Sequence, residues 1–235
     1  MPFNLWHIKT ENAMRYQLVL NANKEPVPYN HLHQLTGTIH KWLGANAIHD
    51  GLSLYSYGWL KGGNTQKGIL HFTQGATWNI SFFDDTLSKQ LLKGILEDPS
   101  VAFGMKVQEV REITPPSFKT QHTFYTDGSS ILVRRKRVDG SREYLFSDSL
   151  AANAIMTQTL RKKLAQAGFT EKDLQVQIAF DRTYQNPRIR KVTIKGIEHK
   201  GSECPIIIEG TPEAIEFAWL VGIGDLTGSG FGALR

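Results

Sequence analysis

The sequence has little cysteine and no long apolar run. Its single cysteine, Cys204, cannot form a disulfide within the chain or supply a zinc site made of several thiolates, and this scarcity favours a reducing compartment. No stretch reaches the roughly 18 apolar residues that a membrane-spanning helix needs, and the first residues lack the basic start and apolar stretch of a signal peptide. We therefore expect a cytoplasmic protein that does not enter a membrane.

The overall composition is that of a globular protein. Hydrophobic residues make up 40% and charged residues 21% of the 235 positions, which is enough apolar material for one large domain or two small ones. Lys and Arg number 27 against 22 Asp and Glu, so the formal net charge is +5. This balance suits a polyanionic partner, and most of the surplus lies in the second half of the chain.

The basic residues of the second half fall into three tight groups. They are Arg134 to Arg137, Arg161 to Lys163, and Arg188 with Arg190 and Lys191. Any one group, taken alone, is more typical of a solvated face. Three groups in one small domain favour nucleic-acid binding, because clustered cations neutralise phosphates and release counterions.

Two adjacent prolines, Pro115 and Pro116, divide the chain into two patterned regions. Proline breaks both helices and strand pairing, so we expect a domain of residues 1–115 and a second of residues 116–235. The periodicity predicts β-α-β-β-α-β in the first domain, with Asn30 as the N-cap of its first helix. The predicted elements are a strand at 16–20, a helix at 32–43, strands at 54–60 and 69–83, a helix from 84, and a strand at 101–113.

The second region repeats this order with additions. Asp139-Gly140 predicts a tight hairpin turn, and Asp148 and Gly168 are expected to begin and end a long helix. Further strands are expected at 174–181, 189–198 and 204–209, followed by a helix from about Thr211 to Val221. The fold class is therefore α+β, with two tandem ferredoxin-like (βαββαβ, RRM-like) domains.

The segment after this last helix, GIGDLTGSGFG at residues 222–232, has five glycines. Its spacing and its position after a helix exclude a dinucleotide fingerprint, and no Gly-Lys-Ser or Gly-Lys-Thr follows as a phosphate-binding loop requires. A flexible tail is one remaining interpretation. The other is a loop whose unblocked amides meet RNA backbone or the other domain.

This segment resembles the CRISPR-associated endoribonucleases of the "Cas six" type, which cut precursor CRISPR RNA within its repeats. Their hallmark is a C-terminal loop of the form G-hydrophobic-G, five residues, G-hydrophobic-G, and Gly222 to Gly232 match it without a gap. The PYNH segment at 28–31 and the YSYGWL strand at 55–60 extend the resemblance, whereas residues 1–13 precede the usual start of the family. The resemblance implies RNA cleavage without a metal or other cofactor. In this reaction a ribose 2′-hydroxyl attacks the adjacent phosphate, and the products carry a 2′,3′-cyclic phosphate and a 5′-hydroxyl.

The resemblance also implies catalytic residues in the first domain, which holds most of the histidines. His49 occupies the place of a histidine that follows the first helix, and His40 that of a second catalytic side chain on this helix. Histidine suits general acid and base roles because its ordinary pKa is near 6.5. The alternatives are that His40 covers the edge of the core and that His49 is a cation at a helix C-terminus.

One catalytic position departs from the family pattern. Some members have a lysine where this sequence has Ser53, so Lys41 or a residue of the glycine loop is left to supply positive charge. His31 and His33 are reserve candidates. No convincing set of metal ligands accompanies the His49-Asp50 pair.

For binding, the resemblance implies a CRISPR repeat RNA, with other CRISPR-associated effector proteins as further partners, and a monomer or homodimer. A non-catalytic subunit that holds repeat RNA and an unrelated ferredoxin-like RNA binder are the alternative functions. The residues expected to contact RNA are Arg134, Arg135, Lys136, Arg137, Arg188, Arg190, Lys191, Gly222, Gly224, Gly230 and Gly232.

Overall fold

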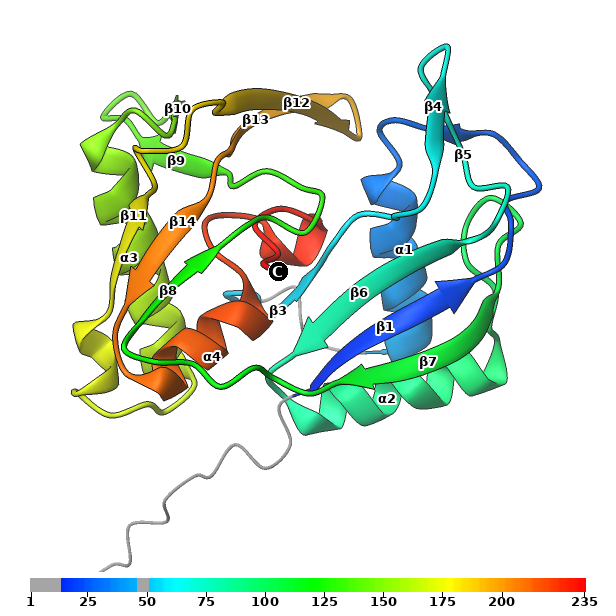
Figure 1. The fold of residues 1–235 in the computed structure, drawn as a ribbon, viewed down its shortest axis with the longest axis horizontal. Helices are drawn as coiled ribbons and strands as arrows, with labels where there is room; N and C mark the ends of the chain where they lie inside the picture. The colour runs from blue at the N-terminus through cyan, green and yellow to red at the C-terminus, as the bar shows by residue number, and fades with distance from the viewer. Residues whose placement is uncertain (1–13, 46–50) are drawn as a thin grey trace, which may run out of the picture.

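The computed structural model describes residues 14–45 and 51–235, and its two halves lie side by side (Figure 1). The predicted boundary falls in the connection between strands β7 and β8. The elements of the first half are β1 (Met14–Leu20), β2 (Val27–Pro28), α1 (Leu32–Leu43), β3 (Tyr55–Tyr57), β4 (Asn64–Gln66), β5 (Ile69–His71), β6 (Ala76–Phe82), α2 (Asp85–Glu97) and β7 (Val107–Ile113).

The main sheet of the first half has the strand order β3-β6-β1-β7, and every neighbouring pair is antiparallel. With α1 and α2 this is the predicted ferredoxin-like domain. The α2 helix begins where its sequence indicates, because the Asp84 side chain accepts hydrogen bonds from the backbone of Thr86 and Leu87. A small additional sheet, β2-β5-β4, was not expected.

The predicted N-cap of α1 is wrong. The helix begins at Leu32, and His31 precedes it without a side-chain capping bond. The amide oxygen of Asn30 instead accepts a hydrogen bond of 3.1 Å from the backbone N–H of Thr193. Asn30 therefore links the two halves of the molecule.

The second half also has a ferredoxin-like core, and two hairpins project from it. Its sheet has the order β11-β14-β8, and residues 233–235 take the place of a fourth strand, because Tyr125 and Arg235 exchange backbone hydrogen bonds of 3.3 and 2.8 Å. Its elements are β8 (Gln121–Phe124), β9 (Val133–Lys136), β10 (Arg142–Leu145), α3 (Leu150–Gln166), β11 (Gln177–Phe180), β12 (Arg188–Ile194), β13 (Ile197–Glu203), β14 (Ile206–Glu209) and α4 (Pro212–Val221), with short 3-10 turns η1 (Asp173–Gln175) and η2 (Thr227–Ser229).

Most local signals of the second half are confirmed. The Asp139-Gly140 turn joins β9 to β10, and Gly168 follows the end of α3 at a φ of +82°. The long helix begins at Leu150, slightly later than expected, and the predicted strand at 189–198 is divided between β12 and β13. The hairpins β9–β10 and β12–β13 project beyond the ferredoxin-like core, along one edge of the molecule (Figure 1).

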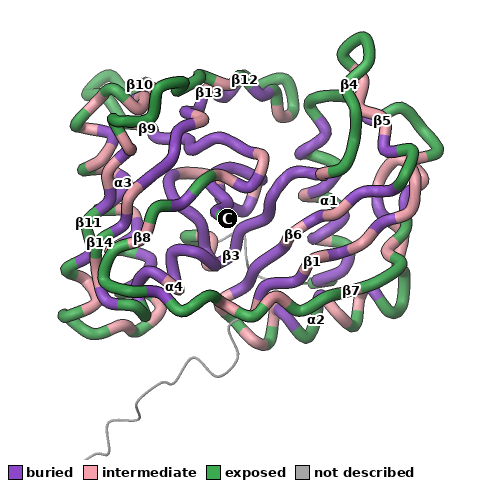
Figure 2. The backbone as a smooth tube through the Cα atoms, viewed as in Figure 1, coloured by how far each residue is buried: buried purple, intermediate pink, exposed green. Residues whose placement is uncertain are grey.

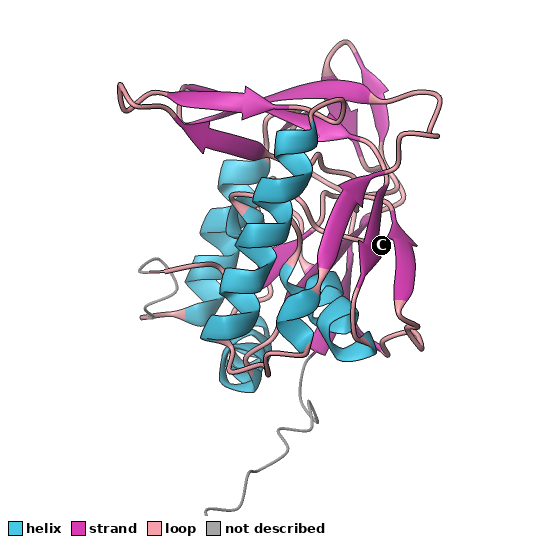
Figure 3. Ribbon diagram, turned by 90° about the vertical axis from the view of Figure 1, so that its left-hand side faces the viewer, coloured by secondary structure: helices cyan, strands magenta, loops and turns pink. Residues whose placement is uncertain are grey.

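The long helices gather on one side of the molecule, and strands form the other side (Figure 3). Each half has its own apolar core, but the core of the first half also takes in Leu132, Val192 and Phe231 from the second. Figure 2 shows that the chain around the C-terminus is largely buried where the halves meet. Among the described residues, no helix is long and apolar enough to cross a membrane.

Candidate functional site

The glycine-rich loop at residues 222–232 lies in the junction between the two halves. A Cβ atom added to Gly230 would lie 2.7 Å from a Leu32 methyl carbon and 2.8 Å from the Tyr57 ring, both in the first half. A Cβ atom on Gly224 would lie 2.5 Å from the carbonyl oxygen of Leu132 in the second half. Both glycines also have positive φ angles, of +85° and +84°. Glycine is therefore required here by close packing and by backbone conformation.

Side chains of β3 and the residues after it hold this loop from the first half. The Tyr55 hydroxyl donates to the carbonyl of Gly228 at 3.1 Å, and the Trp59 indole N–H donates to the carbonyl of Gly230 at 3.2 Å. In the other direction, the Thr227 hydroxyl donates to the carbonyl of Tyr55 at 3.1 Å. Burial raises the pKa of Tyr55 to about 12, so this phenol keeps its proton at neutral pH.

The four glycines that the sequence assigned to RNA contact lie in the interior of the structure. Gly222, Gly224, Gly230 and Gly232 are all buried. Of the alternatives considered for this segment, contact with the other domain is the one observed. Direct contact of these four glycines with RNA does not fit their burial.

Helix α1 passes beside the loop and carries His40. Thr36 lies one turn before His40 on the same side of the helix, and its hydroxyl is 2.6 Å from the hydroxyl of Tyr57 in β3. This contact turns that side of α1 toward β3 and the glycine loop. His40 is partly buried in the last turn of the helix.

His49 lies outside the described residues. The chain after it returns to the glycine loop, because a Cβ atom added to Gly228 would be 2.8 Å from the hydroxyl oxygen of Ser53. Ser53 is partly exposed. The structure thus brings the position where some family members have lysine into contact with the loop.

The reserve histidines differ in their access to a substrate. His31 is fully buried, and its Nδ1 atom lies 3.0 Å from the carbonyl oxygen of Tyr29. Burial lowers the pKa of His31, and this outweighs the hydrogen bonds to backbone carbonyls that raise it. His33 is exposed on α1. His31 is therefore a packing residue, whereas His33 is open to solvent.

Lys41, considered as a source of positive charge, is directed elsewhere. Its Nζ atom donates to Asp98 Oδ2 at 2.8 Å and to the carbonyl of Ser100 at 2.5 Å. These partners follow the end of α2. Lys41 therefore fastens α1 to the connection between α2 and β7.

The basic residues of the two hairpins fall into two groups. Arg134 is paired with Asp225 of the glycine loop at 2.8 Å, and Arg190 is paired with Glu203 at 2.9 Å and also donates to the carbonyl of Gly128. These two arginines have structural partners within the second half. The other predicted RNA contacts are exposed, namely Arg135, Lys136, Arg137, Arg188 and Lys191. Of these, Arg135 and Arg137 pair with Glu143 at the surface, and Lys191 pairs with Glu198.

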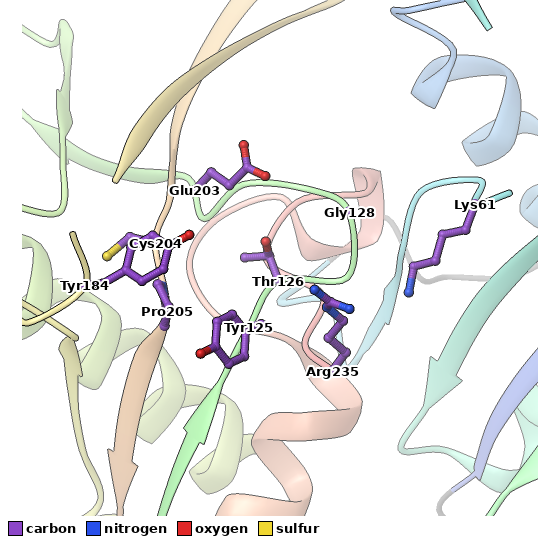
Figure 4. Close-up of a pocket in the computed structure, with 9 residues that line it drawn as sticks. All are labelled: Lys61, Tyr125, Thr126, Gly128, Tyr184, Glu203, Cys204, Pro205 and Arg235. Carbon is purple, nitrogen blue, oxygen red and sulfur yellow. The ribbon is translucent and has the colours of Figure 1, made fainter. Parts of the chain in front are cut away.

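A shallow cavity of about 280 Å³ lies between the halves on the strand side of the molecule. Figure 4 shows Tyr125, Tyr184 and Arg235 around it, with Lys61 on the side of the first half. The Lys61 amine forms an ion pair with the buried carboxylate of Asp127. Burial, followed by the charges of two nearby arginines, lowers the pKa of Lys61 to about 8.

Two buried cations were missed by the sequence analysis. Arg15 on β1 donates to the carbonyl of Leu234 at 2.7 Å, and Lys163 on α3 donates to the carbonyl of Val221 at 3.0 Å. Both are less than 5% exposed. Lys163 stands seven residues after Met156 and three after Leu160, so helical spacing alone indicated a place on the buried face.

No metal site is apparent in the part of the chain that the structure describes, where no three His, Cys, Asp or Glu side chains come together as ligands. The described part of the candidate site consists of the glycine loop, the adjoining side of α1, Ser53, and the exposed basic residues of the hairpins.

Two tandem ferredoxin-like domains with a glycine-rich loop in their junction define the structural class. The family model for the C-terminal part of the CRISPR associated protein Cas6 matches residues 112–235. That range is more than half of the chain and includes the whole loop. The chain belongs to the Cas6 family.

Solved structures show the same fold over nearly the whole chain. A Cas6-related protein from Pyrococcus furiosus has a TM-score of 0.83 at 18% identity, covering 95% of this chain and 98% of its own. A RAMP protein that binds different RNA substrates has a TM-score of 0.80 at 17% identity, with coverage of 94% and 98%. A Cas6 product complex has a TM-score of 0.68 at 17% identity, with coverage of 95% and 98%. The comparison with curated protein sequences gives no match.

Proposed function

We propose that this protein is an endoribonuclease that cuts CRISPR repeat RNA. The observation that carries the proposal is the seating of the glycine-rich loop of a Cas6-family chain against Leu32 of α1, Tyr57 of β3 and Ser53. The likeness to a RAMP protein that binds RNA and to a Cas6 product complex supports an RNA substrate.

The reaction that suits this site is an internal transesterification. The 2′-oxygen forms a bond to phosphorus while the bond from phosphorus to the 5′-oxygen breaks. One proton leaves the 2′-hydroxyl and one is delivered to the departing 5′-oxygen, so a general base and a general acid are both needed. The products are a 2′,3′-cyclic phosphate and a 5′-hydroxyl, and no step requires a metal.

We assign these proton transfers to His40 and His49. His40 lies one turn after Thr36, the α1 residue whose hydroxyl contacts Tyr57 of β3, and His49 comes four residues before Ser53, which packs against the loop. An imidazole can hold or release a proton near neutral pH, which suits either role. Positioned acids and bases each contribute roughly 10²–10⁴-fold to a rate.

The grip on RNA is assigned to the exposed hairpin residues Arg135, Lys136, Arg137, Arg188 and Lys191. The hairpins β9–β10 and β12–β13 that carry them lie along one edge of the molecule (Figure 1), where a polyanion can neutralise these cations together. The cavity of Figure 4 adds Tyr125 and Tyr184, whose exposed rings can stack on unpaired bases.

A second function is favoured by one feature of the site. Ser53 stands beside the loop where some family members have lysine, and Lys41 is engaged with Asp98. Without a cation at the scissile phosphate, the same fold would hold repeat RNA without cutting it. The protein would then be an RNA-binding subunit of an effector complex.

Incubation of the protein with repeat-containing RNA in excess chelator distinguishes the two functions. We expect a single cut per repeat, with products that carry a 5′-hydroxyl and a 2′,3′-cyclic phosphate. His40→Ala and His49→Ala should each slow the cut while leaving RNA affinity within about threefold, since histidine is removed from the chemistry and not from the basic edge. His71→Ala, on β5, is the control.

Tight binding without any cut would support the RNA-binding subunit. If both histidine variants cut at the rate of the unaltered protein, the residue assignment is wrong even if the activity is present.

A further inference from the structure

The amine of Lys163 occupies a buried point where three parts of the chain meet. It lies on α3 and is only 2% exposed. Its Nζ atom is 3.0 Å from the carbonyl oxygen of Val221, 3.5 Å from that of Gly222 and 3.0 Å from the hydroxyl oxygen of Thr227. A lysine buried in this way costs free energy unless its amine is well bonded, so these three acceptors account for its presence.

The acceptors belong to the two ends of one short segment. Val221 is the last residue of α4 and Gly222 is the first of the glycine loop, whereas Thr227 begins the 3-10 turn η2 within the loop. One amine therefore closes the first part of the loop upon itself. It also supplies a donor for carbonyl groups that the end of α4 leaves without a helical partner.

The contacts continue from Thr227 into the first half of the molecule. The Thr227 hydroxyl donates to the carbonyl of Tyr55, and the Tyr55 hydroxyl donates to the carbonyl of Gly228. Gly228 is the residue packed against Ser53. A continuous chain of contacts thus runs from α3 in the second half to Ser53 in the first.

A second charged anchor holds the loop. Asp225 is paired with Arg134 of β9 at 2.8 Å, on the side of the loop that packs against the second half. This pair holds the middle of the loop toward β9, and Lys163 holds its beginning and its 3-10 turn. The two anchors act on different parts of the same eleven residues.

We propose that Lys163 is a positioning residue of the glycine-rich loop, which holds η2 against β3 and so sets the place of the loop at the RNA-cutting site. This inference rests on the proposed function. Lys163 does not touch RNA, because it is buried. It acts through Thr227, Tyr55 and Gly228.

The test uses Lys163→Met, which keeps the length of the side chain and removes the donor, and Lys163→Gln, which keeps a donating amide. Thr157→Val is the matched control, because Thr157 is a buried α3 residue whose hydroxyl bonds the backbone of Ile178 in β11 instead of a loop residue. Amide hydrogen exchange without RNA reports on the loop directly. The single-turnover cutting rate with saturating enzyme and the Kd for repeat RNA show how the position of the loop affects cleavage and binding.

In Lys163→Met we expect the backbone amides of Asp225, Ser229 and Gly232 to exchange about tenfold faster, while those of β11 and β14 keep their rates. We expect the cutting rate to fall at least about tenfold with Kd changed less than about threefold, since a small displacement near reacting groups costs rate and not binding. The exchange rates and the cutting rate of Lys163→Gln should lie between those of Lys163→Met and those of the unaltered protein. Thr157→Val should reproduce neither effect.

Unchanged loop exchange in Lys163→Met would overturn the inference, as would equal acceleration in Thr157→Val. Faster loop exchange with an unaltered cutting rate would overturn the positioning role. If the unaltered protein does not cut repeat RNA at all, the proposed function fails, and the exchange measurement still decides whether Lys163 holds the loop.

Discussion

Arg15 belongs to β1 of the first half, yet its guanidinium group is buried against the second half. It donates to Ser81 Oγ at 2.7 Å and to the carbonyls of Leu234 and Trp219, and its Cζ atom lies 3.7 Å from the Trp219 ring centroid. Burial lowers the pKa of Arg15 to about 9, so the group remains a cation at neutral pH. This one side chain serves acceptors on both sides of the junction.

Replacing Arg15 by leucine should lower the free energy of unfolding by roughly 2–4 kcal/mol, because two buried carbonyl groups lose their donor. Urea denaturation measures the change. Arg111→Ala is the control, since Arg111 pairs with Glu109 on the exposed strand β7 and its loss should leave the urea midpoint nearly unchanged. Equal effects of the two substitutions would contradict the role given to Arg15.

Lys163 gives the protein a stability that changes with pH. Burial lowers the pKa of Lys163 from 10.5 to about 7, although Asp225 of the loop acts in the opposite direction. Between these two pH values the unfolded chain binds a proton that the folded chain does not, so the free energy of unfolding rises with pH through this window. Relative to Lys163→Met, the unaltered protein should gain stability from about pH 7 to pH 10 in urea titrations. A constant difference over this range would show that Lys163 titrates normally.

Among the elements, α1 and α2 each contain a glycine, and the surroundings of the two glycines are opposite. A Cβ atom on Gly94 in α2 would lie 2.1 Å from the carbonyl oxygen of Trp42, so this glycine lets the two helices approach. Gly37 in α1 has nothing among the described residues within 4 Å of such an atom. It lies four residues after His33 and three before His40, on the same side of the helix.

The two glycines form a matched pair for substitution by alanine. Gly37→Ala should raise the free energy of unfolding by roughly 0.5–1 kcal/mol, because alanine has the higher helix propensity. Gly94→Ala should lower it by roughly 1–3 kcal/mol, because the added methyl group meets backbone. Chemical denaturation measures both, and changes of the same sign would contradict the packing described for α1 and α2.

The sequence predicted elements better than contacts, and the basic run at 161–163 shows why. The run is typical of a solvated face, but successive residues of α3 point in different directions around the helix, so their exposure differs. Lys162 is exposed, whereas Arg161 donates to the carbonyl of Val176 at 3.0 Å and Lys163 is buried. Helical spacing indicates which residue turns inward, but only the packed structure reveals the acceptors that make burial tolerable.

The sequence also did not predict which residues, distant along the chain, contact the glycine loop and Asn30. The glycine pattern indicated close approach, but local sequence does not carry the identity of the approaching groups, Leu32 and Tyr57. Asn30 looked like an N-cap because local signals favour asparagine there, and its partner in β12 lies more than 160 residues away. The small sheet β2-β5-β4 was missed because its strands are too short to show alternation.

At the scale of the whole molecule, the two halves differ in charge and in exposure. Arg134 and Arg190 are engaged with partners of the second half, while the projecting hairpins carry the exposed cations Arg135, Lys136, Arg137, Arg188 and Lys191. Because this edge is solvated, its contribution to RNA binding should come mainly from counterion release. We therefore expect substitutions on the hairpins to change RNA affinity and substitutions at the candidate catalytic residues to change the cutting rate.

Lys136→Ala combined with Arg188→Ala should weaken repeat-RNA binding. It should also reduce the slope of log K against log salt concentration by about 1.4, because each phosphate contact on a single strand contributes about 0.7. Lys89→Ala combined with Lys93→Ala, on α2 of the first half, is the control of equal charge. An identical loss of slope in both double variants would mean that RNA does not select the hairpin edge.

The most direct test of the account compares two repeat RNAs in excess chelator, identical except that one lacks the 2′-hydroxyl at the scissile nucleotide. Attack by this hydroxyl is the central claim, since it is the only nucleophile that the proposed reaction uses. We predict that the protein cuts the unmodified RNA and binds the deoxy RNA with similar affinity without cutting it. Cutting of both RNAs at similar rates, or cutting only after a metal ion is added, would contradict the account.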